Sequence, residues 1–451
     1  MDVRTFLHHK ILTLAARAGR LAKVTPLMVG IRQQDLPYAP SANHFKAANQ
    51  RLIKIDREVM KRLAHVQKQQ RTAPLNQVLM DIALVERELD RARRAFGLFF
   101  EIFGQRGSAF APSLDAYDAI AADCYAAIHK AAPRIFRGPM LKPVCYMEHG
   151  YSPATMRRGV VLSRLLGEPN PFPIIRIPWD RDNPWQAVFL HEVAHNLQAD
   201  LGIWQENRQA VLTRVIKDTA DARLTQTYGR WHKEIFADLA ALLLGGTAAA
   251  WGMANFLANP ATKALTYRPG GAHPTAYLRV FILAEMLRRM GFVKEGAQLK
   301  GVWSKLYQSA NPRRLPARLR QSADKLIPKV VDEIAFQPRR NLGQRALVDI
   351  IPFTPKDEAR IRAGAKSLVA GKIPPKLPPR YIVSASAFAL QTGKIPARKL
   401  SNLVTRHLSS TNDPIPNLPP LIPPPLIPTS ASKRNSKRNS KRNKAARVVA
   451  A

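Results

Sequence analysis

The sequence is poor in cysteine and in acidic residues. Its 451 residues include two cysteines, Cys124 and Cys145, too few for a disulfide-stabilised scaffold or a four-cysteine zinc site. The 32 Asp and Glu residues are outnumbered by 70 Lys and Arg, which gives a formal net charge of +38. Such a charge favours an acidic partner, either nucleic acid, an anionic membrane surface or an acidic protein. With 46% hydrophobic residues, the chain is too apolar to be disordered throughout.

The chain also lacks a long uninterrupted apolar run. No signal-peptide core is visible at its start, and with the scarcity of cysteine this predicts a cytoplasmic protein. Residues 3–30 could form a basic amphipathic helix, which would either lie on anionic lipid as a peripheral membrane contact or pack on its own domain. The uncharged stretch 239–262 approaches the length of a membrane span but contains Gly245 and Gly246. We expect two buried helices with a break at these glycines and no stable membrane span.

Apolar periodicity predicts helices over most of the chain. Residues 41–72 and 75–105 repeat apolar positions at intervals of three and four, and Pro74 between them indicates a helical hairpin. A third helix is expected at 113–132, with Ser113 as its N-cap. Further helices are expected at 184–200, 203–225, 231–244, 248–258, 274–290 and 294–309. Short β-branched or aromatic runs at 142–147, 159–162 and 173–177 predict a small mixed sheet, so the fold class is α+β and mostly α.

Changes in composition divide the chain into four regions. We expect an N-terminal helical region with the hairpin at 1–110, a domain with the small sheet at 111–310, a basic helical region at 311–410 and a tail at 411–451. Residues 301–451 hold 29 Lys and Arg against 7 Asp and Glu, which is more than half of the net charge.

The tail itself is low in complexity. Residues 414–428 contain eight prolines, which predicts an extended spacer, and Ser-Lys-Arg-Asn occurs three times in 432–443. This repeat cannot bury a core and is expected to be disordered. It has no aromatic residues to stack on bases, so it either tethers the protein non-specifically to nucleic acid or another polyanion or serves as a solubilising tail.

A His-Glu-x-x-His motif at residues 191–195 is the most informative pattern in the sequence. On a helix, His191 and His195 lie one turn apart on the same face, so both imidazoles can bind one metal ion. Glu192 then lies beside the ion, where its carboxylate can take a proton from a metal-activated water. Zinc suits two imidazole ligands and makes hydroxide accessible near neutral pH.

A second pair of acids, Glu234 and Asp238, is also spaced by one helical turn. Two carboxylates on one face of an apolar helix are costly unless something pairs them. Glu234 as third metal ligand, with Asp238 accepting from the free N–H of a ligand histidine, would satisfy both. His232 is a rival third ligand, but it would leave Asp238 unexplained.

A third motif, His273-Pro274, is followed by Arg279. Pro274 suits the first turn of a helix, which places His273 just before that helix. There His273 could hydrogen-bond to a developing oxyanion, and Arg279 could hold a carboxylate of the site.

In order and spacing, the three motifs resemble the gluzincin metallopeptidases, in particular the branch that contains the CAAX-prenyl endopeptidases and the bacterial heat-shock membrane protease. The resemblance covers roughly residues 140–290. It implies a zincin-like catalytic domain within 111–310, one zinc ion per chain, and a protein or peptide substrate. By position, the implied zinc ligands are His191, His195 and Glu234. The implied roles of the others are general base for Glu192, orientation of a ligand histidine for Asp238, transition-state stabilisation for His273 and a structural role for Arg279.

Some features depart from that branch. Its well-known members have clear membrane spans, residues 196–233 form a long helical insert here, and the basic C-terminal third has no counterpart in that pattern. The extended motif of another family, the metzincins, is absent after His195. We expect the strand at 173–177 to run along the cleft and pair with an extended peptide. The leading hypothesis is a zinc peptidase. The alternatives are a polyanion-binding or nucleic-acid-binding protein with a structural or inactive zinc site, and a membrane-associated peptidase.

Overall fold

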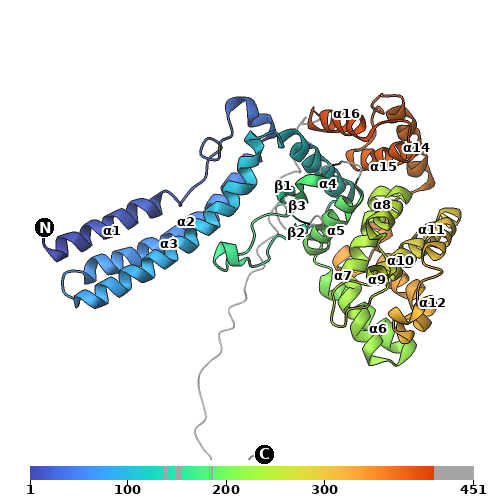
Figure 1. Ribbon diagram of the computed structural model, residues 1–451, viewed down its shortest axis with the longest axis horizontal. Helices are drawn as coiled ribbons and strands as arrows, with labels where there is room; N and C mark the ends of the chain where they lie inside the picture. The colour runs from blue at the N-terminus through green and yellow to red at the C-terminus, as the bar shows by residue number, and fades with distance from the viewer. Residues whose placement is uncertain (137–139, 149, 151–153, 182, 184–185, 411–451) are drawn as a thin grey trace, which may run out of the picture.

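The computed structural model describes residues 1–410 except 137–139, 149, 151–153, 182 and 184–185. The expected proline-rich spacer and the Ser-Lys-Arg-Asn repeat lie outside the described residues. Most of the described chain is helical, and the remaining regular structure is a three-stranded mixed sheet. Figure 1 shows an elongated arm of helices on one side, a larger helical body on the other, and the sheet between them.

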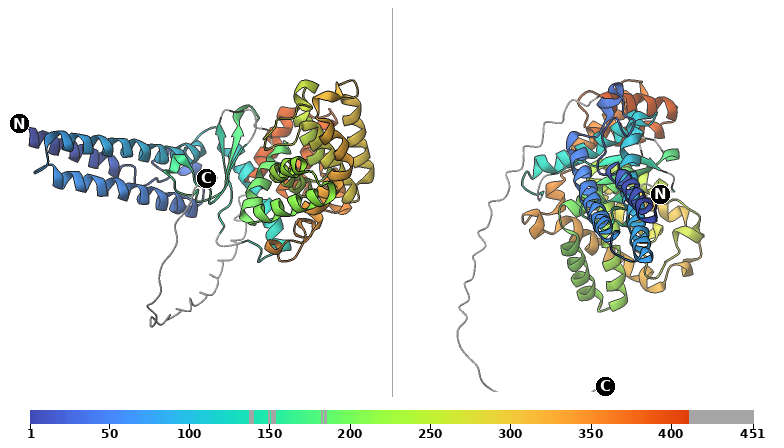
Figure 2. Two further views of the ribbon diagram at one scale, coloured as in Figure 1. Left: turned by 90° about the horizontal axis from the view of Figure 1, so that it is seen from below. Right: turned by 90° about the vertical axis from the view of Figure 1, so that its left-hand side faces the viewer.

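The arm is built from three helices, α1 (Val3–Gly19), α2 (Ala42–Gln69) and α3 (Leu75–Gly104). The predicted hairpin is confirmed, since α2 and α3 pack along their length and Pro74 immediately precedes α3. The first helix also packs on its own domain, because its apolar face is buried against the hairpin through Leu7, Ile11 and Leu14. Figure 2 shows the three helices running side by side away from the body.

The sheet has the order β1 (Val144–Glu148), β3 (Ile174–Pro178), β2 (Ala154–Met156), with β1 parallel and β2 antiparallel to β3. Two of the expected strands are confirmed, but the prediction of a strand at 159–162 is wrong. Gly159 has a positive φ of 76°, and Val161 forms only an isolated bridge to Pro169. The third strand lies earlier, at β2, which has three residues and is too short to give a recognisable alternating pattern.

The two faces of the sheet contact different cores. Val144 and Ile174 face the arm, whereas their neighbours Cys145 and Ile175 belong to the core of the body, as strand alternation requires. Both cysteines are free and buried in that second core. The sheet therefore joins the arm to the body through buried apolar contacts on each side.

Side chains occupy the outer edge of β1. The carboxylate of Asp118 accepts from the backbone N–H of Cys145, and buried Arg106 donates to the Cys145 carbonyl. Gln105 donates to the carbonyl of Met147 and accepts from its N–H. These contacts take the backbone groups that a further strand would need. Within the described residues, β2 is thus the edge strand with no covering strand on its outer side.

The body contains the remaining helices. They are α4 (Ala111–Ala131), α5 (Val188–Asp200), α6 (Trp204–Thr219), α7 (Ala222–Gly245), α8 (Thr247–Leu257), α9 (Ala261–Ala264), α10 (Ala276–Arg289), α11 (Val293–Leu306), α12 (Ala317–Val331), α13 (Leu347–Ile350), α14 (Pro355–Val369), α15 (Pro379–Gln391) and α16 (Ala397–Ser410). The predicted break after 244 is confirmed at Gly246, whose φ of 68° suits glycine. None of the described helices is long and apolar enough to cross a bilayer.

Two helix boundaries differ from the sequence predictions. Helix α4 begins at Ala111 with Pro112 in its first turn, so Ser113 lies inside the helix and is not its cap. The segment predicted as one helix at 203–225 is divided at Ala220, which adopts a left-handed φ of 51°. The side chain of Asp221 then caps the new helix, α7, by accepting from the N–H groups of Arg223 and Leu224.

The helices after residue 311 share the core of the body. Helix α16 packs on α4, α15 contacts α4, α7 and α8, and α12 contacts α10. The buried apolar cluster that contains α5 and α7 continues through Leu326, Ile361 and Leu408. The basic helical region thus belongs to the same core as α5 and α7, the helices that carry His191, His195 and Glu234.

Candidate metal centre

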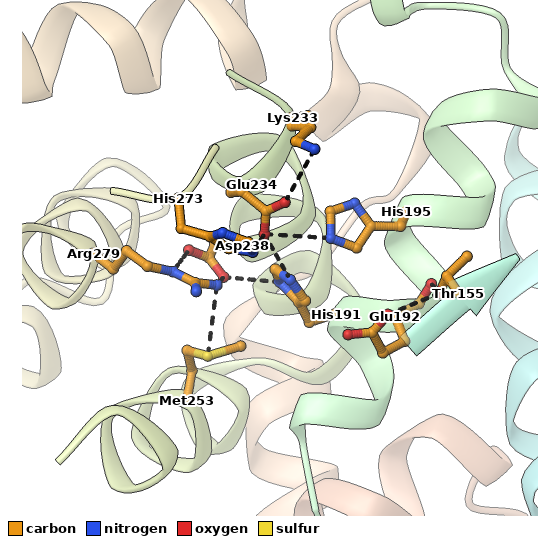
Figure 3. A network of polar contacts seen from close by, with 10 residues as sticks. All are labelled: Thr155, His191, Glu192, His195, Lys233, Glu234, Asp238, Met253, His273 and Arg279. Carbon is orange, nitrogen blue, oxygen red and sulfur yellow. Dashed lines mark hydrogen bonds and ion pairs between the residues drawn. The ribbon is translucent and has the colours of Figure 1, made fainter. Parts of the chain in front are cut away.

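Two packed helices of the body, α5 and α7, carry the His-Glu-x-x-His motif and the acid pair. Helix α5 is buried along almost its whole length, so both histidines are held in an apolar helix as the sequence predicts. Helix α7 places Glu234 and Asp238 on the side that faces α5, and the side chain of Asp238 is fully buried. Figure 3 shows these side chains converging between the two helices.

The structure brings His191, His195 and Glu234 into one cluster whose candidate ligand atoms all lie within 4.8 Å of one another. The Oε2 atom of Glu234 is 3.4 Å from Nε2 of His191 and 3.5 Å from Nε2 of His195. Ligand bonds of about 2.0–2.1 Å in a tetrahedral zinc site imply about 3.4 Å between neighbouring ligand atoms. These residues fit a metal ion of that size and could hold one.

Asp238 lies behind this group and contacts His191 from the other side. Its Oδ1 atom is 2.9 Å from Nδ1 of His191, so Nε2 of the same ring is turned toward Glu234. Arg279, on α10, donates from Nε to Oδ2 of Asp238 at 2.8 Å and from Nη2 to Oδ1 at 2.5 Å. The expectations that Asp238 contacts a ligand histidine and that Arg279 holds a carboxylate of the site match this geometry.

The electrostatics of the metal-free cluster follow from these contacts. Burial acts to lower the pKa of His191, but Asp238 and Glu234 outweigh it and raise this pKa to about 9. Burial acts to raise the pKa of Glu234, but the two histidines hold it well below its usual range. Asp238 behaves similarly, because Arg279 and His191 overcome burial and lower its pKa. Both carboxylates are therefore ionised and able to face a cation.

Glu192 lies on the side of α5 that faces the edge strand. Thr155, in the middle of β2, has its Oγ1 atom 2.8 Å from Oε2 of Glu192 and 3.0 Å from the Glu192 carbonyl oxygen. The single hydroxyl proton can be donated to only one of these oxygens at a time. Thr155 thus fixes Glu192 against the strand, a contact that the sequence does not reveal because three residues are too few for a recognisable strand pattern.

The third motif also reaches the site, with His273 at its rim. Nε2 of His273 is 3.3 Å from Oε2 of Glu234, while the side chain is 65% exposed. Helix α10 begins at Ala276 and is capped by Thr275, so Pro274 precedes the helix instead of forming its first turn. His273 consequently stands in the loop before the helix, two residues further from it than the sequence predicts.

His232, the rival ligand, is directed away from the cluster. Its Nδ1 atom is 2.8 Å from the carbonyl oxygen of Gly229, and its ring packs edge-on against Trp204. Residues two positions apart on a helix point about 200° away from each other around its axis, so His232 and Glu234 occupy different faces of α7. The structure supports the choice of Glu234 over His232.

The metal group opens into a pocket of about 720 Å³. Ala154, Thr155 and Arg157 form the wall at the edge strand, and Met253, Phe256 and Leu257 form an apolar wall on α8. The predicted position of the cleft strand is wrong. The segment 173–177 is the central strand β3, flanked by β1 and β2, so its backbone groups are already paired. The strand beside the pocket is β2.

Comparison of the chain with protein-family models, with curated proteins and with solved structures finds no match. The assignment of function therefore depends on the geometry of this site.

Proposed function

We propose that this protein is a zinc-dependent peptidase of the gluzincin type, and that it hydrolyses internal bonds of peptides. The observation that carries the proposal is the combination of His191, His195 and Glu234 in one group with Glu192 in the lining of the same pocket. Two imidazoles and one carboxylate form a donor set that suits zinc and leaves a fourth position free. The group lies in a pocket with an edge strand on one side, which suits an extended peptide.

Each of the chain's own residues has a defined task in this proposal. When bound by His191, His195 and Glu234, zinc supplies a Lewis acid at the floor of the pocket. The carboxylate of Glu192 accepts a proton from the attacking water and donates it to the leaving amine. His273, exposed at the rim, donates to the oxyanion that develops on the scissile carbonyl. The edge of β2 holds the peptide backbone.

Asp238 and Arg279 act through the ligands and do not meet the substrate. Oδ1 of Asp238 lies 2.9 Å from Nδ1 of His191, so a proton on Nδ1 faces this carboxylate and Nε2 is left available for the metal. Arg279 keeps Asp238 ionised in a fully buried position. The alternative of a polyanion-binding protein with an inactive zinc site draws on the charge of +38, but it gives no reason for Glu192 to be present and held by Thr155.

Replacement of Glu192 by Gln tests the proposal. The variant keeps the volume of the side chain and its contact to Thr155 but removes the base, so we expect hydrolysis of an unfolded protein such as casein to fall by at least 1,000-fold. Zinc content, measured by mass spectrometry of the metal, should stay at one per chain. Glu58→Gln, at an exposed position of α2, is the matched control and should behave as wild type. Undiminished hydrolysis in Glu192→Gln would refute the assignment.

A further inference from the structure

The pocket wall beside β2 holds an aromatic side chain in contact with two cations. The guanidinium carbon of Arg157 lies 4.6 Å from the ring centroid of Trp204, and Nζ of Lys233 lies 5.7 Å from the same centroid. All three residues line the pocket that contains the metal group. Arg157 directly follows β2, Trp204 begins α6 and Lys233 precedes Glu234 on α7. Three separate elements of the fold are needed to assemble this cluster.

The position of Arg157 directs it toward the cleft. It lines the pocket together with Thr155, the strand residue that contacts Glu192. Within the described part of the chain, Arg157 forms no ion pair with a carboxylate, and its partner is the ring of Trp204. Burial lowers the pKa of Arg157, although the negative charge of Glu234 opposes this. The guanidinium of Arg157 is half-buried and contacts an aromatic ring, so a carboxylate that accepted its hydrogen bonds would stabilise its charge.

The charges that line the pocket do not balance. Its two carboxylates, Glu192 and Glu234, both have tasks in the proposed chemistry, and a bound zinc ion would offset their charge. Arg279 is neutralised by Asp238. The lining also contains Arg157, Lys233 and Arg268, of which Lys233 lies 3.9 Å from Oε1 of Glu234. A zinc-loaded pocket is thus strongly positive, and a concave site of one sign attracts ligands of the opposite sign.

We propose that this cleft selects peptides with a carboxylate close to the scissile bond, and that Arg157 and Lys233 bind this carboxylate beside Trp204. The inference rests on the proposed peptidase function and names its substrate class. A peptide paired with the edge of β2 passes Arg157 immediately after the strand ends, so the recognised group lies within one or two residues of the bond that is cut. An Asp or Glu side chain and a free peptide C-terminus offer the same chemistry to a guanidinium.

Binding without cleavage tests the inference. Full-length Glu192→Gln protein, loaded with zinc, is titrated calorimetrically with acetylated and amidated alanine-rich decapeptides that carry one Asp at each position in turn. A second series carries Asn at the same positions, and a third has no Asp but a free C-terminal carboxylate. We expect an Asp peptide, or the free-carboxylate peptide, to bind about 10- to 100-fold more tightly than its neutral counterpart. The series that shows the gain identifies the source of the carboxylate.

Variants of the cluster and a matched control complete the test. Arg157→Gln should remove most of the gain, whereas Lys294→Gln, at an exposed position of α11 outside the pocket, should leave it intact. Arg157→Glu should transfer the preference to peptides with Lys in place of Asp, a result that a misfolded protein cannot give. Equal affinity for all three series overturns the inference.

The same peptides separate this inference from the proposed function. Wild-type protein is incubated with each series, and products are detected by mass spectrometry. A carboxylate preference in binding, without hydrolysis by the zinc-loaded wild type, would count against the peptidase and leave the carboxylate site established. Hydrolysis without any preference for Asp or a free C-terminus would refute the carboxylate site alone.

Discussion

The buried ion pair between Asp238 and Arg279 makes a quantitative prediction about stability. The Asp238 side chain is fully buried and that of Arg279 is 7% exposed, so neither charge is solvated well when its partner is lost. Removing one member of a buried, hydrogen-bonded pair costs about 3–5 kcal/mol. Arg279→Met retains much of the side-chain volume and extends toward Met253, whose sulfur is 3.8 Å from Nη2 of Arg279.

The two single substitutions differ in what they leave behind. Arg279→Met leaves Asp238 in contact with His191, whose pKa is raised to about 9, so a positive partner persists at neutral pH. We expect the lower end of the range, about 3 kcal/mol. Asp238→Asn leaves a buried guanidinium without a carboxylate and should cost about 5 kcal/mol. The double variant removes both charges, so its cost should be below the sum of the two by about 2–4 kcal/mol.

Urea unfolding of the metal-free proteins, followed by circular dichroism and tryptophan fluorescence, measures these costs. A chelator is present throughout so that metal binding does not contribute to the free energy of unfolding. Coincident transitions from the two probes are the condition for a single free energy. Costs below about 1 kcal/mol for both single variants, or strict additivity in the double variant, would refute the account of this pair.

Three further predictions concern neighbouring parts of the structure. Thr155→Val should lower kcat roughly tenfold with little change in KM, and Thr155→Ser should restore it, because the hydroxyl positions Glu192. Gly246→Ala should cost about 2–4 kcal/mol in urea unfolding, since the φ is 68° and a Cβ would lie 2.2 Å from Cζ of Phe353. Gly291→Ala, with a φ of 91° but no atom within 4 Å, should cost only about 1 kcal/mol. Burial lowers the pKa of the His44 imidazole below its usual 6.5, so the unfolded chain binds a proton at this ring more readily than the folded protein does. The free energy of unfolding should therefore fall as the pH drops below 6.5. His44→Gln should weaken that dependence in urea midpoints measured between pH 7.5 and 5.5, and an unchanged slope would contradict it.

Long amphipathic patterns were sufficient to predict much of the helical architecture. The hairpin of α2 and α3 follows from regular apolar spacing and Pro74, and the break near Gly246 follows from paired glycines in an apolar run. The division at Ala220 was missed because an alanine with a positive φ has no sequence signature, and the cap at Asp221 resembles any other surface acid. Tertiary packing of α6 on α7 requires the chain to turn there.

In the candidate site, too, some contacts can be predicted from the sequence and others cannot. Residues joined by helical spacing, such as His191 with His195 and Glu234 with Asp238, could be paired from sequence because both members lie on one element. Contacts between residues on different helices or strands could not be predicted in this way. Thr155 meets Glu192 only because a three-residue strand lies against α5, and Arg157 meets Trp204 only because that strand ends beside α6. Strand β2 has only three residues, so its edge position, which defines the cleft, is visible only in the assembled sheet.

Stoichiometric reconstitution with zinc tests the central proposal most directly. Metal-free protein is titrated with zinc while hydrolysis of casein is measured at each addition. The proposal predicts no hydrolysis without metal, a linear rise up to one zinc per chain, and no rise in a His195→Ala variant. Hydrolysis that persists in the presence of a chelator, or a fully zinc-loaded protein that cleaves neither casein nor the acidic decapeptides, would contradict it.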